Sequence, residues 1–254
     1  MEILPTIYFY VSFFIALIIT YVVQLIFEFI NIIPTLLGGE TLVSPHTRLE
    51  IMTDIFLSNY YYKVKFNPFW DLKIQGKENL IKHKKVIFMA NHLAGIDPIF
   101  ISKVLLDFGI IYKSVGDKSL WDIPIVSSVL SKTNDIGIKF EKINDRWKAT
   151  NNNEINELSK YYLNNNTAIV VFPEGRISKT GELNELKHGF FKLAIETGTP
   201  IIPIKIENTQ NLLNKEYNNL AAISGTASIT IKKPISSKNI SIEDLVTKVT
   251  KDLS

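Results

Sequence analysis

A histidine and an aspartate five residues apart are the first residues in this chain whose types and spacing suit chemistry. His92 and Asp97 lie in the run Met89-Ala90-Asn91-His92-Leu93-Ala94-Gly95-Ile96-Asp97-Pro98. Residues five apart do not share a helical face, because such faces recur at three and four residues. We therefore predict a turn that folds the carboxylate back onto the imidazole, with Gly95 in the left-handed region. Asp97 would then accept the ring N–H, and His92 would act as a general base.

A second polar arrangement follows about 80 residues downstream, in the run Phe172-Pro173-Glu174-Gly175-Arg176. Glu174 and Gly175 are predicted to form a tight turn after a strand. Backbone N–H groups in that turn, together with Arg176, could bind an anion. The alternative for Arg176 is a surface ion pair with Glu174 or Glu182.

Composition excludes several other kinds of site. The chain has 254 residues, and its 28 Lys and Arg against 25 Asp and Glu give a formal charge of +3. Charges that are balanced this evenly give no electrostatic reason to expect nucleic-acid binding. The absence of cysteine excludes thiol nucleophiles, cysteine zinc sites and disulfides. With four histidines, we expect no multi-histidine metal site. We interpret His188 as structural and His83 as part of a solvated basic loop.

An apolar run of 21 uncharged residues, from Ile7 to Phe27, predicts an N-terminal membrane helix. As a helix it would be roughly 30 Å long, enough to cross the hydrocarbon core. A cleaved signal peptide fits less well, because the run is too long and no basic segment precedes it. A monotopic element that enters the bilayer without spanning it is left open. Arg48, Lys63 and Lys65 follow the run, which predicts that the catalytic part faces the cytosol.

The segment from Arg48 to Phe66 is predicted to be a second, amphipathic helix. Its apolar residues recur at helical spacing, namely Leu49, Met52, Ile55, Phe56 and Tyr60. Tyrosines at 60–62 beside lysines at 63 and 65 are typical of an interfacial belt at the level of lipid headgroups. A helix packed on the protein core is the equal alternative.

In the remainder, short apolar runs alternate with helical patterns, which predicts an α/β fold with a mainly parallel central sheet flanked by helices. The predicted strands are Val86–Ala90, Gly109–Lys113, Asp135–Ile138, Ala168–Phe172, Ile201–Ile206 and Ala227–Ile231. The predicted helices are Pro98–Asp107, Ile123–Ser131, Asp145–Leu163, Gly189–Thr197 and a terminal helix after Ser241. Both polar arrangements follow strands, where α/β folds place ligand-binding loops. We predict membrane-anchoring helices over 1–70 and a catalytic domain over 71–254.

These motifs resemble those of the lysophospholipid acyltransferase family, also called the glycerolipid acyltransferases, which includes the 1-acylglycerol-3-phosphate O-acyltransferases. The resemblance runs from about Lys85 to Ile204, roughly half of the chain. The first block is Asn91-His92-x4-Asp97, and Lys118-Ser119-Leu120-Trp121-Asp122-Ile123-Pro124 is similar to a lysine-containing stretch that precedes the second block. The third block is Phe172-Pro173-Glu174-Gly175, and the fourth is Thr199-Pro200-Ile201-Ile202-Pro203-Ile204.

The chain departs from the family pattern in two blocks. The second usually reads Gly-x-x-Phe-x-x-Arg, but the segment from Gly137 to Ile143 lacks the arginine, and Lys142 or Arg146 would substitute for it. Lysine replaces the charge but not the bidentate fork. In the third, Arg176 follows Gly175 directly, where the family usually has threonine and then arginine. This variant resembles the bacterial 2-acylglycerophosphoethanolamine acyltransferase and leaves the acceptor headgroup open.

The resemblance implies that His92 deprotonates the free hydroxyl of 1-acylglycerol-3-phosphate, which attacks the thioester of acyl-CoA or acyl-carrier protein and gives phosphatidic acid. The implied site residues comprise phosphate contacts from Glu174, Gly175, Arg176, Lys118 and Lys142, and supporting roles for Asn91, Gly137, Pro173 and Pro203. No acyl-enzyme, further cofactor or metal is expected. The alternatives are a remodelling acyltransferase with an acceptor such as lysophosphatidylethanolamine, a hydrolase using the same pair, and a non-catalytic lipid-binding relative. Acyl-chain length, the donor and the oligomeric state are left open.

Overall fold

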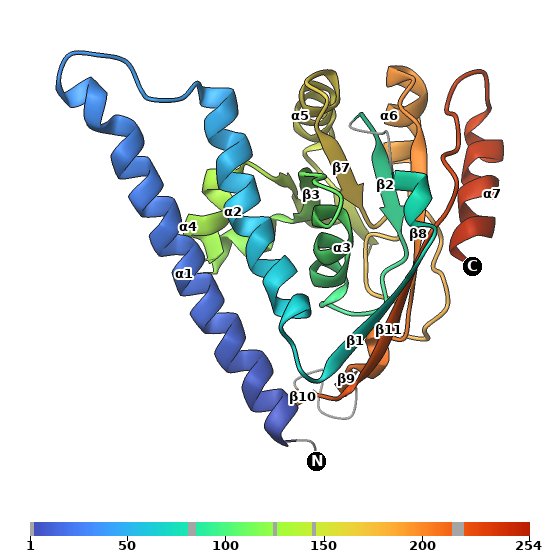
Figure 1. Ribbon diagram of the computed structural model, residues 1–254. Helices are drawn as coiled ribbons and strands as arrows, with labels where there is room; N and C mark the ends of the chain where they lie inside the picture. The colour runs from blue at the N-terminus through green and yellow to red at the C-terminus, as the bar shows by residue number, and fades with distance from the viewer. Residues whose placement is uncertain (1–2, 81–84, 124–125, 144–145, 215–220) are drawn as a thin grey trace.

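A twisted sheet forms the centre of the molecule. The computed structural model describes residues 3–80, 85–123, 126–143, 146–214 and 221–254, and within these ranges seven strands form one sheet (Figure 1). Their order is β1 (Trp70–Gln75), β11 (Gly225–Ile231), β8 (Ile201–Glu207), β2 (Ile87–Ala90), β7 (Ala168–Val171), β3 (Tyr112–Asp117) and β4 (Ile136–Ile138). The strands from β8 to β4 are parallel, whereas β11 is antiparallel to β8 and β1 is parallel to β11. The predicted α/β fold with a mainly parallel sheet is confirmed.

Helices cover both faces of this sheet, because the parallel strands are apolar on both sides. One face packs against α1 (Ile3–Leu36), α2 (Pro45–Lys65), α3 (Asp97–Leu106) and α4 (Val126–Thr133), and the other against α5 (Asn152–Asn164), α6 (Gly189–Thr197) and α7 (Ile242–Leu253). Successive residues of a strand point to opposite faces. Accordingly, Phe88 of β2 joins the first core and Met89 joins the second.

Short elements complete the described part of the chain. They are the 3-10 helices η1 (Lys77–Leu80), η2 (Lys118–Asp122) and η3 (Thr209–Asn211), and the two-stranded pairs β5 (Phe140–Ile143) with β6 (Arg146–Ala149) and β9 (Leu213–Asn214) with β10 (Ala221–Ala222). Strand β1 is not among the predicted strands. The strand predicted over Gly109–Lys113 is shifted, because Gly109 adopts a positive φ of 65° in the turn after α3 and β3 runs from Tyr112 to Asp117. The other predicted strands agree with the structure to within two residues at either end.

The prediction of one helix over Asp145–Leu163 is wrong in its first part. Strand β6, which pairs with β5, lies in that part, and α5 begins only at Asn152. Asn151 precedes the helix, and its side chain accepts the Lys139 N–H at 2.9 Å while donating to the Gly137 carbonyl at 2.9 Å. An asparagine that bonds to neighbouring backbone in this way favours a turn or cap over a helix interior. The predicted helix over Ile123–Ser131 is also shifted, since α4 begins at Val126.

The two N-terminal helices lie side by side along one flank of the molecule (Figure 1). Among the described residues, α1 is the helix whose length and apolar composition suit the crossing of a membrane. It is longer than the predicted run and leaves many large apolar side chains exposed, such as Phe14, Ile15, Ile18 and Ile19. The division of the chain at residue 70 stays a prediction.

The second helix, α2, packs on the core. Met52, Phe56 and Leu57 are buried against the α/β part, as the packed alternative predicts. Lys63, which the interfacial alternative places among lipid headgroups, is instead buried between α2 and α1, with Nζ 4.2 Å from the ring centroid of Phe13. Burial lowers the pKa of Lys63 to about 7. The aromatic residues beyond it, including Tyr62 and Phe66, remain exposed.

Candidate active site

The candidate site lies at the carboxyl end of β2, and Asn91 fixes that end in place. The Asn91 amide donates to the Ile206 carbonyl at 2.8 Å and accepts the Ile206 N–H at 2.7 Å. Its side chain therefore continues the pairing of β2 with β8 by one residue after the strand ends. Because Asn91 is buried, both bonds are shielded from water. The supporting role predicted for Asn91 corresponds to this contact.

The predicted contact between His92 and Asp97 is present. His92 Nδ1 lies 2.8 Å from Asp97 Oδ2, and the same oxygen accepts the backbone N–H groups of Leu93 at 2.6 Å and Ala94 at 2.9 Å. These bonds close the turn with the carboxylate itself. Gly95 does not adopt positive φ, so the expected left-handed glycine is wrong. The helix α3 begins at Asp97, one residue earlier than predicted.

This geometry leaves one imidazole nitrogen available for chemistry. Asp97 is fully buried, whereas 17% of the His92 side chain is exposed. A carboxylate that accepts from Nδ1–H fixes the tautomer in which Nε2 carries a lone pair. Nε2 has no hydrogen-bond partner among the described residues. The pair can therefore take a proton at Nε2 and stabilise the resulting imidazolium.

The loop after β7 wraps around His92. The Phe172 ring stacks on the imidazole with centroids 4.1 Å apart, and Glu174 Oε1 accepts the His92 backbone N–H at 2.7 Å. On the other side, the Ser178 N–H donates to the His92 carbonyl at 2.8 Å. Gly175 has φ +67°, and its N–H donates to the Phe172 carbonyl at 3.1 Å, which is the predicted tight turn. Two segments that are far apart in the sequence thus share one rigid site.

The carboxylate of Glu174 faces inward, so the prediction that it contacts a substrate phosphate is wrong. Besides the His92 N–H, it accepts the backbone N–H of Asn184 at 2.8 Å and the Asn184 side-chain amide at 2.6 Å. Only 2% of Glu174 is exposed. A buried carboxylate with three donors holds the loop together, and it would repel a phosphate.

Arg176 is an exposed cation of this loop. Its Nη2 donates to Asn184 Oδ1 at 3.1 Å. The alternative of a surface ion pair is wrong, because within the described part of the chain Arg176 pairs with neither Glu174 nor Glu182. No carboxylate among the described residues therefore pairs with its guanidinium.

The other predicted cations lie further along the same edge of the sheet. Lys118 follows β3, which β7 separates from β2, and its Nζ lies 3.6 Å from Glu154 Oε1. Its methylene groups cover Gly137, where a Cβ atom would lie 3.4 Å from Lys118 Cγ. Lys142 is exposed on β5 of the hairpin. The structure brings Arg176, but neither lysine, onto the loop that contacts His92.

The remaining motif residues are structural. The carbonyl of Pro173 accepts the Lys187 N–H at 2.8 Å, and Pro203 lies on β8 opposite Met89. His188 is exposed at the start of α6, edge-on to Phe191, and its structural interpretation stays a prediction. His83 lies outside the described residues.

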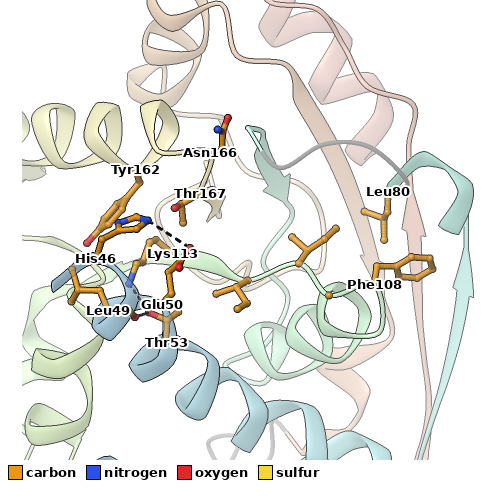
Figure 2. A pocket seen from close by; sticks show the side chains of 13 residues that line it. His46, Leu49, Glu50, Thr53, Leu80, Phe108, Lys113, Tyr162, Asn166 and Thr167 are labelled. Carbon is orange, nitrogen blue, oxygen red and sulfur yellow. Dashed lines mark hydrogen bonds and ion pairs between the residues drawn. The ribbon is translucent and has the colours of Figure 1, made fainter. Parts of the chain in front are cut away.

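A cavity of about 520 Å³ lies at the opposite edge of the sheet (Figure 2). It opens beside the starts of β3 and β7, whereas His92 follows the end of β2, so it is not part of the candidate site. His46, Glu50, Thr53 and Lys113 converge on one side of it, and Leu80 and Phe108 lie on the other. Burial lowers the pKa of Lys113, whose ammonium donates to the hydroxyl of Thr53 and the carbonyl of Thr133.

A histidine oriented by a buried carboxylate, next to a loop with an exposed arginine, is an arrangement suited to proton transfer beside an anionic group. The chain belongs to the Acyltransferase family, whose model matches residues 71–207. That match contains the His92–Asp97 pair and Arg176.

Named relatives agree with this assignment. The chain is 34% identical over 143 residues to the 1-acyl-sn-glycerol-3-phosphate acyltransferase of Borreliella burgdorferi, covering 56% of this chain and 53% of that protein. It is 31% identical over 185 residues to the protein of the same name from Saccharomyces cerevisiae, covering 71% and 57%. The chain thus spans little more than half the length of these relatives.

A solved structure shares the fold. The crystal structure of the 1-acyl-sn-glycerophosphate (LPA) acyltransferase PlsC from Thermotoga maritima matches with a TM-score of 0.71 and 24% identity. The match covers 99% of this chain and 92% of that one, so it includes the two N-terminal helices.

Proposed function

We propose that this protein transfers a fatty acyl group from acyl-CoA or acyl-carrier protein to the free hydroxyl of 1-acylglycerol-3-phosphate, giving phosphatidic acid. One observation carries the proposal: His92, held by buried Asp97, packs against the loop that presents Arg176. A base and a cation on one rigid unit suit an acceptor that has a hydroxyl near a phosphate. The relatives' names support the same acceptor.

In the proposed mechanism, His92 Nε2 takes the hydroxyl proton while the hydroxyl oxygen attacks the thioester carbonyl. The tetrahedral intermediate then collapses, the carbon–sulfur bond breaks, and the imidazolium returns the proton to the departing thiolate. Asp97 stabilises the imidazolium between these steps. No acyl-enzyme forms, because the acceptor oxygen itself is the nucleophile. Arg176 holds the phosphate so that the hydroxyl faces Nε2.

We also propose that α1 anchors the protein to a membrane, with the catalytic part on the cytosolic face. The exposed apolar residues of α1 support a lipid contact, because water disfavours a surface of this kind. A lysophospholipid would then reach the site from the membrane.

The test offers purified protein a panel of lysophospholipids, each with labelled acyl-CoA or acyl-carrier protein, and identifies the products by mass. We expect phosphatidic acid from lysophosphatidate and a rate about 10²–10⁴-fold lower for His92→Ala. His188→Ala is the matched control and should keep the wild-type rate. An active His92→Ala protein would refute the mechanism.

The panel includes lysophosphatidylethanolamine as a second acceptor, because Arg176 directly follows Gly175. Preference for lysophosphatidylethanolamine would make this protein a remodelling acyltransferase. Release of free fatty acid without any acceptor would indicate a hydrolase, and no turnover with any donor would indicate a non-catalytic lipid-binding relative.

A further inference from the structure

Glu174 and Arg176 carry opposite charges two residues apart on one turn, but their side chains do not pair. The Glu174 carboxylate is buried beneath the His92 backbone, whereas the Arg176 guanidinium is exposed. The side chain of Asn184 contacts both of them. It comes from the irregular segment that follows the turn, ten residues after Glu174.

The two ends of the Asn184 amide are used differently. Nδ2 donates to Glu174 Oε2 at 2.6 Å, and Oδ1 accepts from Arg176 Nη2 at 3.1 Å. Chemistry fixes this orientation, because the reversed amide would place oxygen against a carboxylate and NH₂ against a guanidinium. A single neutral group therefore separates the two charges and bonds to each with the matching polarity.

The segment that carries Asn184 is fixed at both ends. At one end, Ser178 donates its N–H to the His92 carbonyl at 2.8 Å and its hydroxyl to the Glu182 carbonyl at 2.6 Å. At the other, the Lys187 N–H donates to the Pro173 carbonyl at 2.8 Å. Asn184 is thus held relative to the same backbone that positions His92.

We propose that Asn184 is a positioning residue for the acceptor's phosphate, acting through Arg176. It keeps the guanidinium apart from Glu174 and directs it outward from the His92 loop. This inference rests on the proposed function, in which Arg176 contacts the phosphate. A guanidinium has five N–H donors, and Asn184 is the one partner of Arg176 among the described residues, so most donors are left for phosphate oxygens.

The first experiment compares Asn184→Ala with wild type in steady-state kinetics on lysophosphatidate. We expect the KM for lysophosphatidate to rise about tenfold, the loss that corresponds to a weakened hydrogen bond to a charged group. The kcat should change less than threefold, because His92 and Asp97 keep their contact. Glu185→Gln, at the exposed neighbouring residue, is the control and should leave both constants unchanged.

A double-mutant cycle with Arg176→Ala tests whether Asn184 acts through the arginine. In the Arg176→Ala background, Asn184→Ala should change KM by less than twofold, because the contact that it supports is already absent. If Asn184 had a purely structural role, the KM increases of the two single variants would multiply in the double variant. An unchanged KM in the single variant, a fall in kcat alone, or multiplied losses would each overturn the inference, while His92-dependent turnover would leave the proposed function standing.

Two further measurements cover the remaining outcomes. If Asn184→Ala does not fold, Asn184→Ser keeps a hydroxyl that can donate to Glu174 but is too short to contact Arg176 as well, so KM should still rise, and an unchanged KM would overturn the inference. Equilibrium binding of lysophosphatidate should weaken about tenfold in the folded variant. A wild-type protein that neither acylates nor binds lysophosphatidate would overturn the proposed function and this inference together.

Discussion

Asp97 Oδ2 accepts three N–H groups, while its second oxygen, Oδ1, is buried without a partner among the described residues. The carboxylate therefore closes the turn with one oxygen, and its charge is aimed at the imidazole. Such an arrangement serves both folding and chemistry, because the bonds that shape the turn also fix the His92 tautomer.

Asp97→Asn should separate these two roles. The amide oxygen can replace Oδ2 in the turn, but the NH₂ group would then occupy the buried Oδ1 position without an acceptor, costing about 1–3 kcal/mol of stability. The missing charge no longer stabilises the imidazolium, so kcat should fall by about 10²–10⁴. Thermal unfolding and steady-state kinetics measure the two effects. A variant with the wild-type kcat would contradict the assigned role of Asp97.

Glu174→Gln tests whether this carboxylate holds the loop or binds substrate. Glutamine has one acceptor oxygen, which keeps both bonds from Asn184 when the NH₂ group faces the single N–H of His92. Displacing the His92 backbone should lower kcat by about tenfold, a loss of about 1.4 kcal/mol in the transition state. The KM for lysophosphatidate should stay within about twofold, since Glu174 is buried away from solvent. A large rise in KM with unchanged kcat would instead support the hypothesis that Glu174 contacts the phosphate directly.

At the scale of elements, the contact between α1 and α2 contains an unusual charge. Lys63 is buried on α2 against Phe9 and Phe13 of α1, and its Nζ has no hydrogen-bond partner among the described residues. The cation–π contacts offset part of the cost of burying an ammonium, but its pKa is still lowered to about 7.

This lowered pKa predicts a pH-dependent stability. Between pH 7 and the ordinary lysine pKa, the unfolded chain binds the proton that folded Lys63 has lost, so the contribution of Lys63 to stability rises with pH across that window. Below about pH 7, the full cost of burying the ammonium applies. Lys63→Met should therefore stabilise the protein on the order of 2–4 kcal/mol at pH 7 and by less at pH 9.5. Thermal unfolding in detergent measures this difference, and an effect independent of pH would disprove the titration.

At the scale of the whole molecule, the exposed face of α1 is the largest departure from a soluble surface. Its outer residues are isoleucine, phenylalanine, valine and leucine, while the opposite side of the helix packs on α2 and Trp70. Glu28 near its end pairs with Arg48 of α2, which fixes the two helices relative to each other.

Two charges on the outer face of α1 should weaken membrane attachment. Ile15→Glu with Ile19→Glu places carboxylates where lipid contact is proposed, at a cost of about 2–3 kcal/mol each in a bilayer. We expect the double variant to lose flotation with phospholipid vesicles and to acylate membrane-presented lysophosphatidate more slowly. Lys248→Glu on exposed α7 is the control and should float like wild type. Unchanged flotation of the double variant would reject α1 as the anchor.

Features that depend on neighbouring residues could be predicted from the amino-acid sequence alone. Residues five apart do not share a helical face, so a contact between His92 and Asp97 requires a turn, and Gly175 marks another turn. Both turns were therefore predictable from local geometry. Alternating apolar runs were enough for the α/β class and for most strands of the central sheet. The family resemblance added the order of the motifs and the reaction that they imply.

The tertiary structure decided what depends on contacts distant in the sequence. Nothing near Asn184 indicates that it separates Glu174 from Arg176, because that contact exists only once the loop is folded. Likewise, the sequence pattern of Lys63 beside tyrosines predicts a surface charge, whereas in the structure α1 covers this lysine. Periodicity and spacing describe each segment in isolation, whereas burial and hydrogen-bond partners are set by which segments pack together.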